Sequence, residues 1–239
     1  MSFKLPTEKS EIVTDLSSQV ILVYGRPKIG KSTFCSRFEK PLFLATEPGL
    51  NHLSVYKVVV NSWDTFLAAC AEIARGEHDY KTIVIDTIDK LTIFCAEWVC
   101  SENGVNHPSE LPHGKGWHMI TSELNRALTK LANLPYGLVM VSHAEMEEIE
   151  TKNRKYNRWT ISVSGKNKRI YLDLPDMILF VDSEMDAQGE EQRIIRTDQS
   201  MYWEAGIRDN PENPVNLPAE IPLDYKIFSG YFNGANAQK

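Results

Sequence analysis

The chain is poor in cysteine and in long apolar runs, and each shortage excludes a class of protein. Its four cysteines among 239 residues include no Cys-x-x-Cys pair, so neither a disulfide framework nor a zinc ribbon is expected. No apolar stretch approaches the roughly 20 residues that cross a bilayer. Residues 1–18 are polar and do not show the pattern of a secretory leader. We therefore expect a soluble, cytoplasmic protein with reduced thiols.

Net positive charge is also lacking. The formal net charge is −6, which argues against a protein that binds nucleic acid through a globally positive surface. Any contact with DNA must be local, or be built by oligomerisation. The chain does contain 42% hydrophobic residues over a length that one core can fill. Its composition therefore predicts a single sizeable α/β domain with appendages.

Apolar runs alternate with amphipathic stretches from residue 20 to residue 182, which is typical of strands and helices wound into a mostly parallel sheet. We expect an amino-terminal extension at 1–18, a core at 19–200, and a proline-rich arm and tail at 201–239. Strands are predicted at Val20–Tyr24, Leu42–Thr46, Tyr56–Val60, Thr82–Asp86, Gly137–Ser142 and Met177–Val181. Apolar residues at helical spacing predict helices at Lys31–Phe38, Trp63–Arg75, Ile88–Cys100 and Trp117–Leu134.

Three stretches interrupt this alternation and are candidate functional loops. Ser101–Gly116 is rich in proline and glycine, which predicts a long connection. Glu145–Ser164 turns from acidic to basic and ends in alternating residues, which predicts a protruding loop or hairpin. Asp209–Pro222 carries four prolines and predicts an extended arm that leads to an aromatic tail, Tyr225–Phe232. That tail could dock on an adjacent subunit, although packing on its own domain is the simpler expectation.

The strand predicted at Val20–Tyr24 runs directly into the pattern G-x-x-x-x-G-K-S, and a helix-compatible segment follows. This context predicts the phosphate-binding loop of a P-loop NTPase, with ATP and Mg²⁺ as its cofactors. Glycines let backbone N–H groups point at phosphate oxygens, while Lys31 reaches the β and γ phosphates and the Ser32 hydroxyl is a magnesium ligand. The predicted nucleotide-binding residues are Gly25, Arg26, Pro27, Lys28, Ile29, Gly30, Lys31, Ser32 and Thr33.

A second acidic element is needed to hold the water shell of the magnesium ion. The strand Thr82–Asp86 ends in a carboxylate, so Asp86 is the candidate that acts with Ser32 through water. An ordinary turn aspartate at the strand end is the alternative, and Asp89 is a candidate helix cap. Thr87 follows Asp86 where a second acidic residue would otherwise act, so the hydrolytic carboxylate must come from elsewhere. Glu47, after the neighbouring strand, is the candidate, with a turn residue as its alternative.

With these residues the sequence resembles the RecA-type core ATPases. These carry a catalytic glutamate at the Glu47 position and a polar sensor after the Gly137–Ser142 strand, here His143. RecA itself has a glutamine at that position and a longer chain, and a strand-end histidine bonded to nearby backbone is the alternative for His143. More narrowly, residues 25–33, 45–49, 84–87 and 141–143 look like the phage nucleotide-binding proteins of the AAA type, some of them in single-strand-annealing recombination modules with shortened RecA- or RadA-like cores.

The resemblance implies an ATP-hydrolysing protein of phage DNA recombination or replication, acting as a homo-oligomer in the host cytoplasm. Its implied catalytic residues are Lys31, Glu47, Asp86 and His143. Its implied partners are single-stranded DNA and a single-strand-annealing or single-strand-binding protein.

Two basic clusters follow the predicted sensor strand. The first interleaves cations with aromatics, which suits phosphate contacts and base stacking on single-stranded DNA. A solvated hairpin whose charges protect an edge strand is the alternative. By resemblance, the second cluster could supply a cation to the γ phosphate of a neighbouring subunit, although a plain surface cluster explains it equally well. The candidate DNA-binding residues are Lys152, Arg154, Lys155, Tyr156, Arg158 and Trp159, and the candidate trans cations are Lys166, Lys168 and Arg169.

Two other functions share the same phosphate loop. A small-molecule P-loop kinase needs an acceptor pocket and a lid rich in arginine, and lid arginines are not evident. A nucleotide-gated module that hydrolyses slowly could serve as a switch for an annealing partner. An ATPase assay with and without single-stranded DNA separates the three.

Overall fold

The structure is a computed structural model that describes residues 5–10, 12–152, 154–208, 212 and 215–236. Within these residues ten strands form one sheet. The strands are β1 Val20–Gly25, β2 Pro41–Ala45, β3 Tyr56–Val59, β4 Thr82–Asp86, β5 Gly137–Glu150, β6 Lys155–Ile161, β7 Met177–Met185, β8 Glu191–Arg196, β9 Gly206–Ile207 and β10 Glu220–Pro222. The α-helices are α1 Lys31–Cys35, α2 Trp63–Arg75, α3 Ile88–Glu102, α4 Lys115–Ala132, α5 Asn167–Asp173 and α6 Tyr225–Asn236, with short 3-10 helices η1 Leu16–Ser18, η2 Pro108–Glu110 and η3 Pro112–Gly114.

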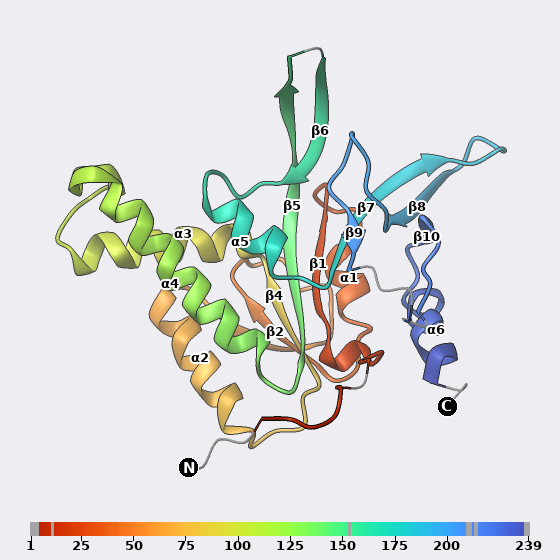
Figure 1. The fold of residues 1–239 in the computed structure, drawn as a ribbon, viewed down its shortest axis with the longest axis horizontal. Helices are drawn as coiled ribbons and strands as arrows, with labels where there is room; N and C mark the ends of the chain where they lie inside the picture. The colour runs from red at the N-terminus through yellow and green to blue at the C-terminus, as the bar shows by residue number, and fades with distance from the viewer. Residues whose placement is uncertain (1–4, 11, 153, 209–211, 213–214, 237–239) are drawn as a thin grey trace.

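The sheet is parallel in its centre and antiparallel at one side. Its order is β10-β8-β7-β1-β5-β4-β2-β3, and neighbouring strands from β7 to β3 run parallel. Strands β8 and β10 extend it with antiparallel pairs, β9 pairs with β7, and β6 folds back on the end of β5. Figure 1 shows the central strands side by side, with the β5–β6 hairpin projecting above them. The expected α/β fold with a mostly parallel sheet is confirmed.

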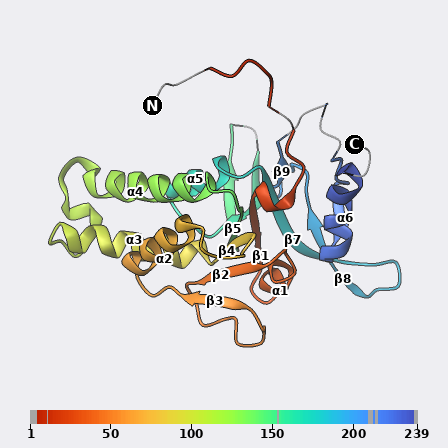
Figure 2. The same cartoon turned by 90° about the horizontal axis from the view of Figure 1, so that it is seen from below.

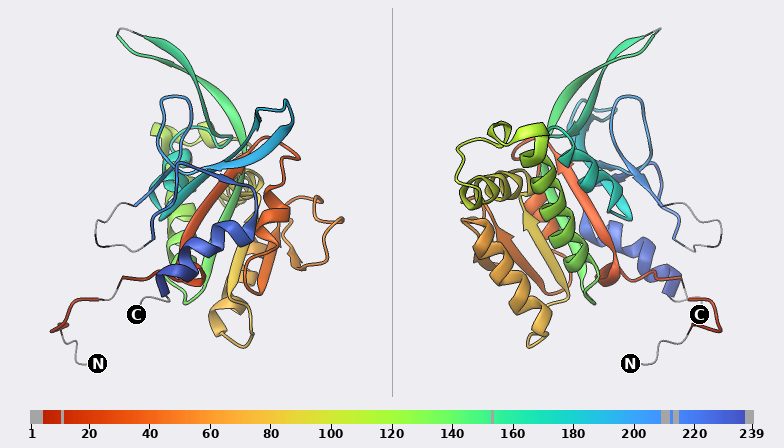
Figure 3. Two further views of the ribbon diagram at one scale, coloured as in Figure 1. Left: turned by 90° about the vertical axis from the view of Figure 1, so that its right-hand side faces the viewer. Right: turned by 60° about the vertical axis from the view of Figure 1, so that its left-hand side comes forward.

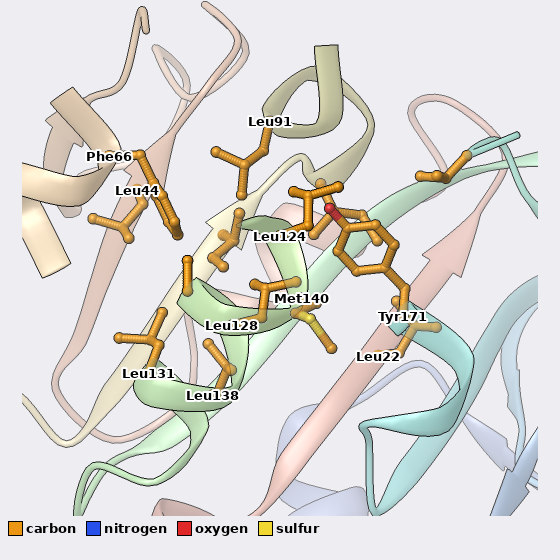
Figure 4. Packing of buried hydrophobic residues seen from close by; sticks show 14 of the residues in the cluster. Leu22, Leu44, Phe66, Leu91, Leu124, Leu128, Leu131, Leu138, Met140 and Tyr171 are labelled. Atoms are coloured by element: carbon orange, nitrogen blue, oxygen red, sulfur yellow. The ribbon is translucent and has the colours of Figure 1, made fainter. Parts of the chain in front are cut away.

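Helices cover both faces of the sheet because strand residues alternate between two apolar clusters. One cluster joins alternate residues of the central strands to α2, α3, α4 and α5, and includes Leu22, Leu44 and Met140 (Figure 4). The other joins the intervening residues, such as Val23 and Val141, to α1 and α6. Figure 2 shows α2, α3 and α4 gathered at one flank and α6 at the opposite end. No helix of the described residues is long and apolar enough to span a membrane.

All six predicted strands and four predicted helices are present, and their ends agree within about four residues except for β5, which continues eight residues beyond its predicted end. Residues 145–164 contain the expected hairpin, because β5 continues to Glu150 and pairs with β6. The long connection at 101–116 contains η2 and η3. Asp209–Pro222 was predicted as an extended arm, and residues 209–211 and 213–214 lie outside the described part; its last three residues form β10.

The aromatic tail, for which no secondary structure was predicted, forms helix α6. Helix α6 packs on its own domain, where Phe228 lies 5.5 Å from Phe34 and Tyr225 lies 4.8 Å from Phe38 between ring centroids. Phe228 is fully buried. The carboxy-terminal segment therefore covers the helix that follows the phosphate loop.

Candidate active site

The phosphate loop lies between β1 and α1, at the carboxyl edge of the parallel strands where ligands bind in such sheets. Gly30 has a φ of 115°, a left-handed conformation that side chains rarely adopt. Gly25 is required for a different reason, because a Cβ there would lie 2.4 Å from the Val181 carbonyl oxygen on β7. One glycine therefore shapes the loop, and the other lets β1 pack against its neighbour.

Lys31 is buried inside the loop. Its ammonium Nζ donates hydrogen bonds to the carbonyl oxygens of Gly25 at 2.8 Å and Arg26 at 2.9 Å. Burial lowers its pKa, and the negative charges of Asp86 and Asp89 oppose that shift. The lysine is held at the mouth of the loop by backbone oxygens rather than by a carboxylate, so its charge is available to an anion.

Ser32 and Asp86 meet across the loop. The Ser32 hydroxyl donates to Asp86 Oδ2 at 2.6 Å, and both groups line the same cavity. Burial raises the pKa of Asp86, while the bond from Ser32 and the charge of Lys31 oppose it. A hydroxyl and a carboxylate in contact are the oxygen ligands that Mg²⁺ prefers, so the residues present fit the expected ion.

Glu47 lines the same cavity and is held by a residue that the sequence did not single out. Thr87 Oγ1 donates to Glu47 Oε1 at 2.9 Å. The Thr87 N–H in turn donates to Thr46 Oγ1 at 2.7 Å, and Thr46 Oγ1 donates to the Thr87 carbonyl at 2.9 Å. The sequence analysis noted Thr87 only because it stands where a second acidic residue would otherwise act. In the structure it positions Glu47, the candidate base.

His143 lies beside Glu47. Its Nε2 is 3.6 Å from Glu47 Oε2, and β5 places it directly across from Gly25 on β1. Its other ring nitrogen, Nδ1, is buried and has no hydrogen-bond partner among the described residues. The imidazole is thus not bonded to nearby backbone, and it faces the carboxylate.

Asp89 does not cap helix α3, which corrects that expectation. The residue before the helix is Thr87, and Asp89 lies in its first turn. Asp89 Oδ1 accepts from the hydroxyls of Ser142, at 2.9 Å, and Ser162, while Oδ2 accepts from the His143 N–H at 3.2 Å. Asp89 therefore fixes the end of β5, and with it the backbone of His143.

The predicted catalytic residues converge on one cavity of about 510 Å³. Lys31, Glu47, Asp86 and His143 all line it, as do five other residues of the loop. His52 and Arg193 also line it, and neither was predicted, because the first lies in a turn after β2 and the second comes from β8, far along the chain. The lining residues are Pro27, Lys28, Gly30, Lys31, Ser32, Thr33, Glu47, Gly49, Leu50, His52, Asp86, Thr87, His143 and Arg193.

The candidate DNA-binding residues lie on the β5–β6 hairpin and not at this cavity. Figure 3 shows the hairpin standing away from the body of the molecule. Lys155 pairs with Glu148 at 2.9 Å and Arg158 pairs with Glu204 at 2.7 Å.

Trp159 is partly buried, and its contact with DNA stays a prediction. Its ring is stacked with that of Phe180, with 6.3 Å between centroids, and it packs against the core. Among the predicted DNA contacts, Lys152, Arg154 and Lys155 are exposed near the hairpin tip, and Tyr156 is half-buried.

The candidate trans cations lie at the start of α5. Lys168 pairs with Glu147 at 3.1 Å and Glu145 at 3.5 Å, and Arg169 pairs with Asp173 at 2.9 Å. Lys166 lines a separate cavity beside Asp89. None of the three lines the phosphate cavity, so contact with a neighbouring subunit stays a prediction.

Comparison with known proteins gives a family for most of the chain. Residues 17–208 match the profile of a family described as AAA domain. The chain is 24% identical over 197 residues to the SPbeta prophage-derived uncharacterized protein YorG of Bacillus subtilis (strain 168), an alignment that covers 79% of this chain and 57% of the relative. The chain thus spans little more than half the length of that relative. A solved KaiC-like protein of Pyrococcus horikoshii OT3 aligns with a TM-score of 0.44 and 14% identity, over 82% of this chain and 81% of the other.

Proposed function

The chain belongs to this AAA domain family, and we propose that it is a magnesium-dependent ATP hydrolase. The observation that carries the proposal is the convergence of Lys31, Ser32 with Asp86, and Glu47 with His143 on one cavity at the carboxyl edge of the sheet. A phosphate loop alone would suit any nucleotide-binding protein. A carboxylate held beyond the phosphate site is what hydrolysis requires in addition.

In this proposal each side chain has a defined task. The loop N–H groups and the Lys31 ammonium bind the β and γ phosphates. Ser32 and Asp86 hold the magnesium ion, which when bound neutralises charge on the phosphate oxygens. Glu47, oriented by Thr87, accepts a hydrogen bond from the attacking water and aligns it with the γ phosphorus.

His143 contributes through its position beside Glu47. Its Nε2 can donate to a phosphate oxygen when the ring is neutral with the proton there, or when it is charged. Because its backbone N–H is held by Asp89, the ring has a fixed base from which to respond to the γ phosphate. It is the proposed sensor of that phosphate.

The hydrolase proposal is tested by Glu47→Gln, with wild type and Thr87→Val measured in parallel. We expect Glu47→Gln to bind ATP with near-normal affinity and to lose about 100-fold or more in turnover, since a positioned base contributes that much. Thr87→Val should lose less, because Glu47 remains but is no longer oriented. Normal turnover in Glu47→Gln would reduce this residue to a turn position and remove the proposed mechanism.

For its biological role, we propose that the hydrolase acts on single-stranded DNA in phage recombination or replication, as a homo-oligomer with an annealing or single-strand-binding partner. The prophage relative supports a phage setting, and the exposed cations Lys152 and Arg154 support a local phosphate contact. We expect DNA to stimulate turnover, and binding to weaken steeply with salt. No binding at low salt would end the DNA role and leave the nucleotide-gated switch.

A further inference from the structure

Arg193 brings a cation to the phosphate loop from the antiparallel side of the sheet. Its guanidinium Nη1 would lie 3.4 Å from a Cβ placed on Gly30, and its side chain lines the same cavity as Lys31. Arg193 and Gly30 are therefore close in space, although they are more than 160 positions apart in the chain. The residues around Arg193 form no motif that predicts its place beside the phosphate loop.

The position of Arg193 is set by rigid structure. Strand β8 is paired with β7 on one side and β10 on the other, and Arg193 lies opposite Ser183. Ser183 Oγ accepts a 2.8 Å hydrogen bond from Arg26 Nη2, so the loop is tied to the strand directly beside Arg193. The Arg193 carbonyl also accepts from the Leu223 N–H at 2.9 Å. The backbone beneath the guanidinium is thereby held on both sides.

A second arginine on the same strand shows what a structural cation looks like here. Arg196 is buried, pairs with Asp182, Glu184 and Glu220, and lies with its guanidinium 4.3 Å from the Trp203 ring centroid. By strand alternation Arg196 faces the opposite side of the sheet from Arg193. Arg193 is exposed, and no carboxylate of the described residues pairs with it. Its side chain lines the cavity, and its charge is not neutralised by a carboxylate of the described residues.

We propose that Arg193 is a nucleotide-binding residue that contacts the phosphate chain in cis, on the side away from Glu47. The sheet order supports this side, because β8 and β2 lie on opposite sides of β1. Glu47 therefore faces the γ phosphate, and Arg193 faces the α and β phosphates that ATP and ADP share. The inference rests on the proposed function for the identity of the ligand, but it concerns affinity and not hydrolysis.

The test compares Arg193→Ala, Arg193→Lys and wild type by calorimetric titration with Mg·ATP and Mg·ADP. We expect Arg193→Ala to raise both dissociation constants about tenfold or more, because it removes a charge-assisted hydrogen bond. Arg193→Lys should recover part of the loss. The matched control is Arg75→Ala, which removes an exposed arginine of α2 that pairs with Glu72. It should change neither dissociation constant.

Each failure has its own signature. Unchanged affinity of Arg193→Ala for both nucleotides overturns the assignment. Weaker ATP binding with unchanged ADP binding and a fall in saturated turnover also overturns it, because that pattern places the guanidinium at the γ phosphate. If wild type binds ATP without hydrolysing it, the hydrolase proposal fails while the Arg193 test still stands. If wild type binds neither nucleotide, both proposals fail.

Discussion

The phosphate cavity and the β5–β6 hairpin both carry several cations, but the cations have different partners in the two regions. In the cavity, Lys31 is hydrogen-bonded to backbone carbonyls, and Arg193 has no carboxylate partner among the described residues. On the hairpin, Lys155 and Arg158 are each paired with a glutamate. An anionic ligand binds the first region without displacing a carboxylate. At Lys155 or Arg158 it would have to compete with a glutamate, so a run of basic residues is a weaker signal than an unpaired cation.

Lys31→Ala tests the difference between the two regions most directly. We expect it to lower ATP turnover by about 100-fold or more, because a buried charge that acts on the transferred phosphate is lost. Lys155→Ala, which removes a paired hairpin cation, should leave turnover without DNA unchanged. Steady-state ATPase assays on the two variants check this. Comparable losses in both would mean that pairing does not distinguish the two regions.

A second, smaller effect concerns Trp159. If its ring is part of the core, Trp159→Ala should lower the free energy of unfolding by about 2–3 kcal/mol, less than for a fully buried tryptophan. Trp159→Phe should keep most of the stability by retaining the contact with Phe180. Denaturant unfolding measures both variants. An unchanged midpoint, together with weaker binding to single-stranded DNA, would return Trp159 to the set of DNA contacts.

The next prediction, smaller still, concerns the loss of stability that comes from burying the Asp86 carboxylate. Burial raises the pKa of Asp86 above its ordinary value of 3.8. The folded protein therefore binds the proton of this carboxyl more tightly than the unfolded chain does. That contribution to stability is fully present below the ordinary pKa, and it is lost as the pH rises through the raised value.

Asp86→Asn mimics the protonated group at every pH. Measured without added nucleotide, it should therefore be more stable than wild type at pH 7, and this gain should shrink toward pH 4. Thermal unfolding across that range checks the sign. Equal stability at pH 7, or a gain that grows with acidity, would contradict it.

The central fold was predictable because its strands are buried on both faces and read as apolar runs between turn signals. Strand β8 was missed because Glu191–Arg196 has two adjacent apolar residues and four polar ones, a pattern without a clear period. Helix α6 was missed because it follows a proline-rich stretch, and its apolar face is explained by packing on distant residues such as Phe34 and Phe38. Such long-range packing leaves little local signal.

The candidate site divides along the same line. The loop residues form a contiguous motif, and Asp86 follows a buried strand, so residue order alone indicated them. Glu47 was indicated by its place after the neighbouring strand, and His143 by resemblance to a family. The structure brings the two together, with 3.6 Å between His143 Nε2 and Glu47 Oε2. Thr87 and Arg193 could not have been found, because the role of each depends on a partner from a distant strand.

Helix α6 makes the carboxy-terminus of the chain an internal reporter on the nucleotide site. Its aromatic residues rest on Phe34 and Phe38, in and just after the short helix that begins with Lys31, and Leu223 ahead of it approaches Gly30. A tag or a fluorophore attached after α6 would therefore be connected to the phosphate loop through one layer of side chains.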